Sequence, residues 1–276
     1  MPVIAMSPEL ATRGNEIAAA LAAQLKLAVI DHEVVEHDIA ERAHIPEDRV
    51  HRLLEGGASI WERWSVNRQS LSRQTSLEIL ELAARGNVVI RGWGATHVLK
   101  DVKHVVSVRT CAPMANRIAT LMRRLGIDNP SMARREIERS DAAHDDMMRR
   151  LFGVEWSDPT VYAITLNTAR VPPDACAAQI ATLAGSAAFA ETDASRSRLE
   201  DLMVLERARA KLDEYAGTSR KGDGFDIEVA GGHLVLGGAS TDAKVIAETV
   251  RVLQSVEGVR SVESKVMHYS FVPQHG

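Results

Sequence analysis

Short apolar runs alternate with longer amphipathic stretches along the first two thirds of this chain. The runs are rich in β-branched side chains and lie at 3–6, 27–30, 87–90, 105–108 and 162–166. Helical patterns at 16–25 and about 59–84 separate them, and Gly86 is placed to end the second helix. Strands that are apolar on both faces and alternate with helices predict a parallel sheet covered by helices on both sides.

The pattern changes after Gly185. Residues 186–198 are small and polar without a hydrophobic period, which predicts a linker. The segments that follow predict a helix at 199–215, a hairpin of strands 225–229 and 233–236, a helix at 242–255 and a last strand at 259–267. We therefore predict an α/β protein with two domains, at 1–185 and 199–276.

Composition and charge narrow the class of protein. The chain has 276 residues, of which 45% are hydrophobic and 25% charged, as in globular proteins. A net charge of −4 disfavours a strongly basic nucleic-acid binder, so we expect no nucleic-acid partner. Cys111 and Cys176 lack the spacing of a zinc site, and two cysteines make no disulfide framework. With no long apolar run and no signal-peptide pattern at the start, we expect a cytoplasmic protein.

Residues 7–16 lie between the first strand and the first helix, where P-loop proteins bind phosphate. That chemistry requires backbone N–H groups converging on the anion, a helix N-terminus behind them and a cation nearby. The segment reads Ser-Pro-Glu-Leu-Ala-Thr-Arg-Gly-Asn-Glu and holds one glycine. By its spacing alone, it is not a Walker A motif.

Residues 2–184 nevertheless resemble the cytidylate kinase-like family of P-loop nucleotide kinases. The resemblance rests on the order and spacing of Ile4-Ala5-Met6-Ser7 through Gly14-Asn15-Glu16-Ile17-Ala18, Val29-Ile30-Asp31-His32-Glu33, Asn87-Val88-Val89-Ile90-Arg91-Gly92-Trp93-Gly94-Ala95, Ala112-Pro113 with Asn116-Arg117-Ile118, Ser140-Asp141 at the start of the family's lid, and Trp156-Ser157-Asp158-Pro159 through Asn167-Thr168-Ala169-Arg170. It implies a P-loop kinase fold, with ATP and Mg²⁺ as cofactors if the chain is an active nucleoside monophosphate kinase of the cytidylate type.

The same resemblance suggests site residues. It assigns phosphate and nucleotide binding to Thr12, Arg13, Gly14, Asn15 and Glu16. Binding of the acceptor nucleotide falls to Asp31, Arg91, Gly92, Trp93 and Gly94. The candidate catalytic residues are Arg117, Asp141 and Arg149, and no metal ligand is assigned.

The loop departs from the family pattern. Ala11, Thr12 and Arg13 stand at the positions of its glycines, which allow backbone amides to approach a phosphate. We expect a Cβ at each position to restrict positive φ and to narrow the amide nest.

Positive charge is lost as well. Asn15 replaces the basic residue that pairs with phosphate, Trp93 replaces the arginine of the Gly-Arg-Gly-Ala motif, and Ala142 and His144 replace a lysine and an arginine of the lid. Phosphoryl transfer depends on positioning and on positive charge, and losing one such cation costs ~10³-fold in rate.

Other arginines offer compensation. Arg13 is near Asn15 in sequence, Arg91 precedes Gly92, and Arg149 and Arg150 follow the lid positions. The alternative is that these arginines are solvated charges on helix faces, balanced by Glu136, Glu138, Asp145 and Asp146. Asp31 likewise has two interpretations, as a contact of the acceptor or as a cap of the next helix.

Residues 199–268 resemble a BON domain, on the residues of 227–238 and of 256–262. The alternating residues Ile227, Val229, Leu234 and Leu236 predict one apolar sheet face, and helix 242–255 has an apolar stripe to cover it. The resemblance implies a non-catalytic module that binds membranes, small ligands or proteins. Its excess of acidic residues disfavours anionic lipid, and its open strand edges favour self-association or a protein partner.

Three functions remain open. The first is a pseudoenzyme that keeps the fold and weak nucleotide binding and acts as a sensor or scaffold through its BON-like domain. The second is an active kinase in which Arg13, Arg91 and Arg117 substitute for the absent residues. The third is a structural or self-assembling protein that binds no nucleotide. The number of separate losses at phosphate-contacting positions favours the first.

Overall fold

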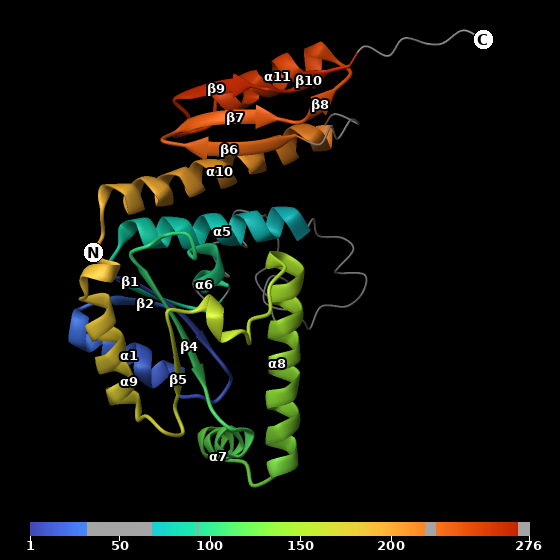
Figure 1. Cartoon of the computed structure of the whole chain (residues 1–276). Helices are drawn as coiled ribbons and strands as arrows, with labels where there is room; N and C mark the ends of the chain where they lie inside the picture. The colour runs from blue at the N-terminus through green and yellow to red at the C-terminus, as the bar shows by residue number, and fades with distance from the viewer. Residues whose placement is uncertain (32–67, 93, 219–224, 270–276) are drawn as a thin grey trace. The chain divides into compact units, whose positions relative to one another are not determined.

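The computed structural model describes residues 1–31, 68–92, 94–218 and 225–269 (Figure 1). The chain forms two compact units, Met1–Ser195 and Arg196–Gly276, and each is described by itself. Among the described residues, no helix combines the length and the apolar character that crossing a membrane requires.

The first unit is built on a five-stranded parallel sheet with the strand order β2-β3-β1-β4-β5. Its strands are β1 (Val3–Pro8), β2 (Ala28–Ile30), β3 (Val88–Arg91), β4 (Val105–Cys111) and β5 (Ile164–Asn167). All five strands expected from the apolar runs are therefore confirmed, as is their parallel arrangement. Because β1 pairs with β3 on one side and β4 on the other, the loop that follows β1 emerges at the centre of the sheet.

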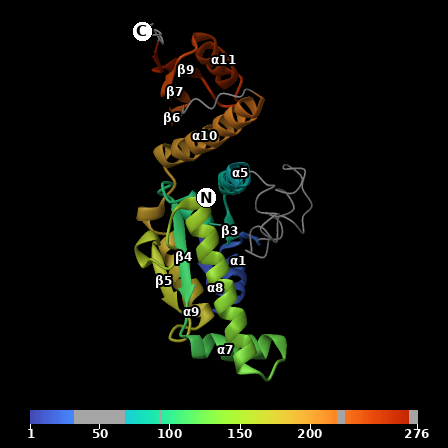
Figure 2. The same ribbon diagram turned by 90° about the vertical axis from the view of Figure 1, so that its right-hand side faces the viewer.

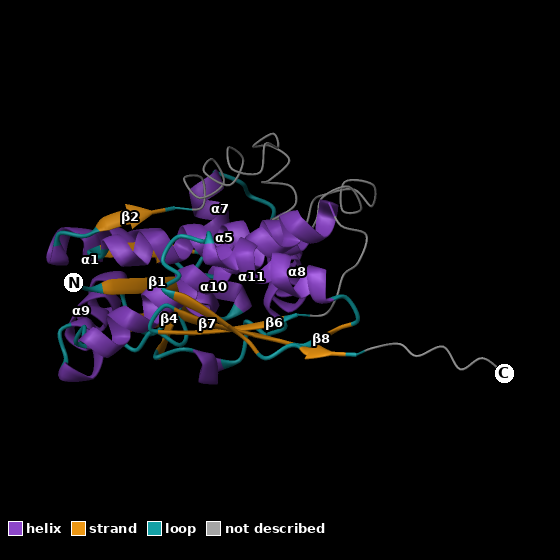
Figure 3. Ribbon diagram, turned by 90° about the horizontal axis from the view of Figure 1, so that it is seen from above, coloured by secondary structure: helices purple, strands orange, loops and turns teal. Residues whose placement is uncertain are grey.

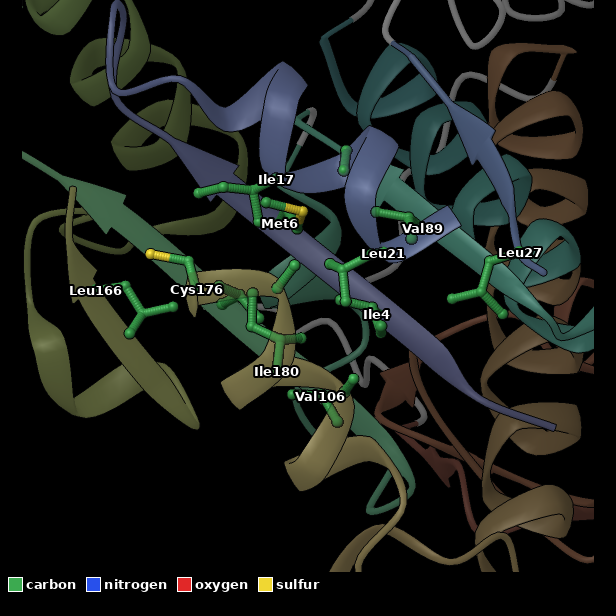
Figure 4. Packing of buried hydrophobic residues seen from close by; sticks show 14 residues of the cluster. Ile4, Met6, Ile17, Leu21, Leu27, Val89, Val106, Leu166, Cys176 and Ile180 are labelled. Carbon is green, nitrogen blue, oxygen red and sulfur yellow. The ribbon is translucent and has the colours of Figure 1, made fainter. Parts of the chain in front are cut away.

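Helices cover both faces of this sheet because successive residues of β1 are buried on opposite sides. Ile4 and Met6 pack in one cluster with α1 (Gly14–Leu25) and α9 (Pro173–Ala184), as Figure 4 shows. Val3 and Ala5, which point to the other face, are as deeply buried. On that second face, α5 (Arg68–Arg85) contacts β3 and the short α6 (Ala95–Val98) contacts β1. The part of the long helix expected before residue 68 lies outside the described residues.

Helices α7 (Met114–Leu125) and α8 (Pro130–Phe152) pack against each other and lie crosswise in Figure 2. Leu121, Ala133 and Ile137 of these two helices pack on Ala11 in the loop that follows β1. Ser140 and Asp141, where the resemblance places the start of the family's lid, lie inside α8, which continues to Phe152. Asn129 caps the start of α8, and the helix contains neither glycine nor a further proline before Gly153, whose φ of 69° ends it.

Helix α10 (Asp193–Thr218) begins earlier than the pattern predicts. Residues 193–198 were expected to form part of an irregular linker, and this expectation is wrong. Thr192 and Ser195 explain the start of the helix, because the Ser195 N–H donates to Thr192 Oγ1 at 3.1 Å and the Thr192 N–H donates to Ser195 Oγ at 3.0 Å. This reciprocal capping supplies partners for backbone N–H groups that the helix cannot satisfy itself.

The second unit contains a three-stranded sheet and the helices α10 and α11 (Ala243–Gln254). Figure 3 draws its helices in purple and its strands in orange. The expected hairpin is confirmed: β6 (Asp226–Ala230) pairs antiparallel with β7 (His233–Gly237) through Gly231 and Gly232, whose φ angles are 59° and 75°. The expected last strand divides into β9 (Ser261–Ser264), parallel to β7, and β10 (Met267–His268), which pairs with a short strand that the pattern missed, β8 (Ala239–Ser240).

The core of the second unit lies on one face of its three-stranded sheet. Ile227, Val229, Leu234 and Leu236 are buried there, as their alternation predicts. Helices α10 and α11 cover this face with residues that include Val204, Ala208 and Leu253.

Candidate functional site

Most of the candidate residues meet at the carboxyl ends of the parallel strands. The loop 9–13 follows β1, Asp31 follows β2, and Arg91 is the last residue of β3. Arg109 of β4 stands in register with Ser7 of β1. This edge of an open parallel sheet is where α/β proteins generally bind ligands.

The loop keeps the left-handed backbone that glycines would provide. Ala11 has a φ of 64° and Arg13 a φ of 62°. The expectation that a Cβ would keep these two residues out of positive φ is therefore wrong. Each such residue costs roughly 1–2 kcal/mol in backbone energy. At Ala11 the buried methyl group packs on Leu121 and Ile137, which offsets part of that cost.

Thr12 holds the loop in place through hydrogen bonds to Glu9 and to Thr110. Its side chain is buried, and Oγ1 lies 2.7 Å from the Glu9 carbonyl oxygen and 2.8 Å from Oγ1 of Thr110 on β4. Gly14, at the start of α1, lies so close to Pro8 that a Cβ would stand 2.7 Å from the Pro8 Cβ. The loop is therefore held to the neighbouring strand, and the first residue of α1 has no room for a side chain.

Arg13 turns back to its own helix. Its Nε and Nη2 donate to the two carboxylate oxygens of Glu16 at 2.8 and 2.6 Å. This pairing raises the pKa of Arg13 and lowers the pKa of Glu16. The guanidinium of Arg13 thus forms a largely exposed ion pair with Glu16 in the first turn of α1.

Arg91 brings three predicted residues together from separate elements. Its Nη2 donates to Oδ1 of Asn15 on α1 at 2.6 Å, and its Nη1 pairs with the carboxylate of Asp31, just after β2. Arg91 is largely buried, whereas Asp31 is partly exposed. A cation therefore stands beside Asn15, the position where the resemblance places a basic residue, and Asp31 neutralises it.

Gly92 and Gly94, two of the other acceptor residues, follow β3. The Gly92 N–H donates to the Met6 carbonyl at 2.9 Å, which joins this turn to β1. Gly94 has a φ of 69° and precedes α6, and a Cβ there would lie 2.3 Å from Cε2 of Phe152. Trp93 lies outside the described residues.

Arg117 and Asp141, two of the candidate catalytic residues, contact each other. Arg117 of α7 donates from Nη1 and Nη2 to the two oxygens of Asp141 on α8, at 2.8 and 2.6 Å. Its Nε donates to the carbonyl of Leu10 in the loop at 2.8 Å. The side chain of Arg117 is 5% exposed, so this cation is held almost entirely by protein acceptors.

The third candidate catalytic residue stands apart from these two. Arg149 pairs with Asp145 one turn away on α8, at 2.6 Å, and Arg150 pairs in the same way with Asp146 at 2.5 Å. Both arginines are exposed. These pairs match the alternative in which the arginines of this helix are solvated charges.

Glu9 and Arg109 form a buried ion pair that the sequence analysis missed. Arg109 Nη2 donates to Glu9 Oε1 at 2.6 Å, and each side chain is 11% exposed. Oε2 of Glu9 lies 3.3 Å from Nη1 of Arg117 and accepts from the Ala112 N–H at 3.4 Å. Burial raises the pKa of Glu9, against the opposing effect of the two arginines. The available signal was an arginine in the middle of the apolar strand 105–111, because arginine is rarely buried without a partner.

Two aromatic rings, those of Trp156 and His144, pack next to the Glu9–Arg109 ion pair. The Arg109 guanidinium lies 5.5 Å from the centroid of the Trp156 ring, and the centroid of the His144 ring lies 4.2 Å from the same point. Burial lowers the pKa of His144 to about 4. At neutral pH this side chain is therefore uncharged, and it does not replace the lid cation of the family.

The described part of the site offers few ligands for a metal ion. In the described ranges, no group of three or more His, Cys, Asp or Glu side chains is placed to hold a metal ion. Thr12 Oγ1 is engaged by Glu9 and Thr110, and the carboxylate of Asp31 is engaged by Arg91. These residues do not fit a resident Mg²⁺, so no chemical step is derived through one.

Comparison with known proteins agrees with this frame. The model of the cytidylate kinase-like family matches residues 3–170, more than half of the chain. No curated protein matches the chain.

Solved structures are similar in part. An uncharacterized protein from Eubacterium ventriosum ATCC 27560 is 18% identical with a TM-score of 0.53, over 67% of this chain and 99% of that one. A shikimate kinase from Acinetobacter baumannii in complex with shikimate is 15% identical with a TM-score of 0.38, over 66% and 92% of the two chains. A gluconokinase from Sinorhizobium meliloti 1021 is 16% identical with a TM-score of 0.38, over 66% and 93%. At these identities, the first likeness supports the fold alone.

Proposed function

Because the chain belongs to the cytidylate kinase-like family, we propose that it is a pseudoenzyme, which keeps the kinase-like frame and weak nucleotide binding without efficient phosphoryl transfer. One observation carries this proposal: the arginines at the site are paired with carboxylates of the same unit. Arg13 pairs with Glu16, Arg91 with Asp31, and Arg117 with Asp141 and Glu9.

The pairing matters because phosphoryl transfer requires uncompensated positive charge around the transferred group. A phosphate that approaches Arg117 meets a guanidinium that already donates to Asp141 and Leu10. It must displace a carboxylate, or share the cation with one at the cost of repulsion between like charges. The loop can still offer backbone N–H groups, since Ala11 and Arg13 keep positive φ. We therefore expect binding to survive better than catalysis.

The proposal is tested by titrating the full-length protein with ATP, with CMP and with both, by calorimetry, next to a coupled kinase assay with Mg²⁺ present. We expect binding of ATP without measurable turnover. A turnover near the common enzyme median of ~10 s⁻¹ on any nucleoside monophosphate would overturn the proposal.

Arg91 is the observation that favours the second candidate, an active ATP- and Mg²⁺-dependent kinase of (d)CMP or another nucleoside monophosphate. Its guanidinium lies beside Asn15 and restores in space the charge that this position lacks in sequence. If the assay detects phosphoryl transfer, Arg91→Met should reduce kcat by about 10³-fold, as expected for the loss of a cation at the transferred phosphate. Arg149→Met, which removes an exposed cation of α8, serves as a comparison and should have the smaller effect.

For the second unit we propose a BON-like module that self-associates or binds a protein, through which the chain acts as a sensor or scaffold. The arrangement of its elements supports a BON-like module, because two helices cover one face of the three-stranded sheet. The other face carries Glu228, Val235 and Glu263 in register. Two acidic side chains in this row disfavour anionic lipid and also direct face-to-face pairing of two copies. Self-association would then involve a strand edge, where β6 and β9 flank β7.

Light scattering of the full chain and of residues 1–198 tests this proposal. A larger oligomer for the full chain than for the shorter one would support self-association through the second unit. Equal oligomeric states would contradict it. If neither the nucleotide titration nor the kinase assay gives a signal while the full chain still assembles, the third function, a structural protein, replaces the first.

A further inference from the structure

We propose that Glu9 is the specificity-determining residue of the loop: its carboxylate occupies the pair of guanidinium groups of Arg109 and Arg117 and thereby excludes a phosphate group from them. This inference rests on the proposed function, in which the site binds phosphorylated ligands weakly. It identifies which residue weakens that binding and which two cations would hold the phosphate once it is removed.

The geometry places Glu9 as a bridge between two elements. One oxygen accepts from Arg109 of β4 at 2.6 Å, and the other lies 3.3 Å from Nη1 of Arg117 on α7. The second oxygen also accepts from the backbone N–H of Ala112 at 3.4 Å. Two guanidinium groups and a backbone N–H around one anionic group are donors of the kind that bind a phosphate. Here, a side chain of the same loop is bound by them.

The charge of the cluster explains why an external anion competes poorly. Arg109 and Arg117 carry two positive charges, and Glu9 and Asp141 carry two negative charges when ionised. A phosphate that enters next to Glu9 adds negative charge to a neutral group of side chains at low exposure, where electrostatic repulsion is strong. If Glu9 loses its charge, the same donors face an acceptor without a full counter-charge.

Arg109 has donor capacity left for such a ligand. Its Nη1 donates to the Ser157 carbonyl at 2.9 Å and its Nη2 to Glu9. Its Nε is buried and has no hydrogen-bond partner among the residues that the structure describes. A buried guanidinium N–H without an acceptor is costly, so an additional oxygen near this edge of the side chain would be stabilised.

The test compares binding of inorganic pyrophosphate to the full-length parent, to Glu9→Gln and to Glu136→Gln by calorimetry. Glu136→Gln is the matched control, because it removes the same charge from another ion pair with an arginine, Arg139, on the exposed side of α8. We expect Glu9→Gln to bind pyrophosphate about tenfold more tightly than the parent does, the effect expected of one additional charge-assisted hydrogen bond. Glu136→Gln should stay within about twofold, since screened surface charges contribute little.

Two further variants make the assignment specific. Adding Arg109→Met to Glu9→Gln should abolish the increase in affinity, because the proposal assigns the phosphate to that arginine. Glu9→Asp keeps the charge and shortens the side chain by one methylene, so it should give a smaller increase if Glu9→Gln does not fold. Equal affinity of the parent and of both Glu9 variants would overturn the inference, and so would an increase that persists without Arg109. Kinase activity of the parent would overturn the proposed function and leave these affinity ratios unaffected.

Discussion

Arg117 on α7 holds Asp141 on α8 through both terminal nitrogens, at 2.8 and 2.6 Å, while its Nε donates to the Leu10 carbonyl at 2.8 Å. One buried side chain therefore joins the loop after β1 to α7 and α8. The conformation of the loop therefore depends on α7 and α8 as well as on its own sequence, because Ala11 also packs on these helices.

The first prediction concerns this ion pair. Asp141→Asn should lower the free energy of unfolding by about 2 kcal/mol, because it leaves a largely buried guanidinium with a weaker acceptor. Asp145→Asn on the same helix removes an exposed partner of Arg149 and should cost less than about 0.5 kcal/mol. Urea denaturation followed by circular dichroism measures both, and equal effects would contradict a structural role for the pair.

Gly94 should not tolerate a side chain. A Cβ at this position would lie 2.3 Å from Phe152 and the backbone has a φ of 69°, whereas Gly126, with a φ of 65°, has no atom within 4 Å of its Cβ position. Gly126→Ala should therefore cost roughly 1 kcal/mol from backbone strain alone. Gly94→Ala should cost about 2 kcal/mol more because of the steric clash. The difference between their thermal unfolding midpoints checks this prediction.

The neutral His144 should make the stability of the protein depend on pH. Burial lowers its pKa from the ordinary 6.5 to about 4, so the unfolded chain binds more protons between these values. Stability is therefore complete above pH 6.5 and decreases as the pH falls towards 4. Asp141, Asp145 and Arg109 also act on this pKa, but burial has the larger effect.

His144→Phe keeps a ring against Trp156 and cannot be protonated. Between about pH 7 and pH 5, it should lose less stability than the parent does, by up to about 2 kcal/mol. Burial also lowers the pKa of His97 to about 4, so part of the pH dependence should remain. Glu9, with its raised pKa, changes stability in the opposite direction as the pH falls. Urea denaturation at both pH values gives the comparison, and identical pH dependence in the two proteins would contradict the assignment.

Asp201 should stabilise the hairpin of the second unit. Its two carboxylate oxygens accept from the N–H groups of Gly231 and Gly232, each at 2.9 Å, and the side chain comes from α10. Asp201→Ala should cost about 2 kcal/mol, because two backbone donors lose their acceptor and the Gly232 N–H is buried. Asp226→Ala, at an exposed position of β6, serves as the control. Hydrogen exchange of peptides from 226–237 should accelerate in the first variant and stay near the parental rate in the second.

The strands, the parallel sheet and the hairpin of the second unit were predictable from the sequence, because these depend on the local alternation of apolar and polar side chains. Val3–Pro8 and Val105–Cys111 are buried on both faces and therefore appear as apolar runs. Elements whose limits depend on single hydrogen bonds were less predictable. The start of α10 is set by Thr192 and Ser195, and the expected last strand is divided between β9 and β10.

Which charges of the candidate site meet is set by the tertiary structure. Glu9 and Arg109 are 100 positions apart, and Arg91 and Asn15 are 76 positions apart. No local pattern predicts such pairs, because the strand order brings them together and β4 lies next to β1 across a long connection. The positive φ of Ala11 and Arg13 is likewise a property of the folded unit. At Ala11, packing of the methyl group on α7 and α8 offsets part of the cost of a backbone conformation that the residue by itself disfavours.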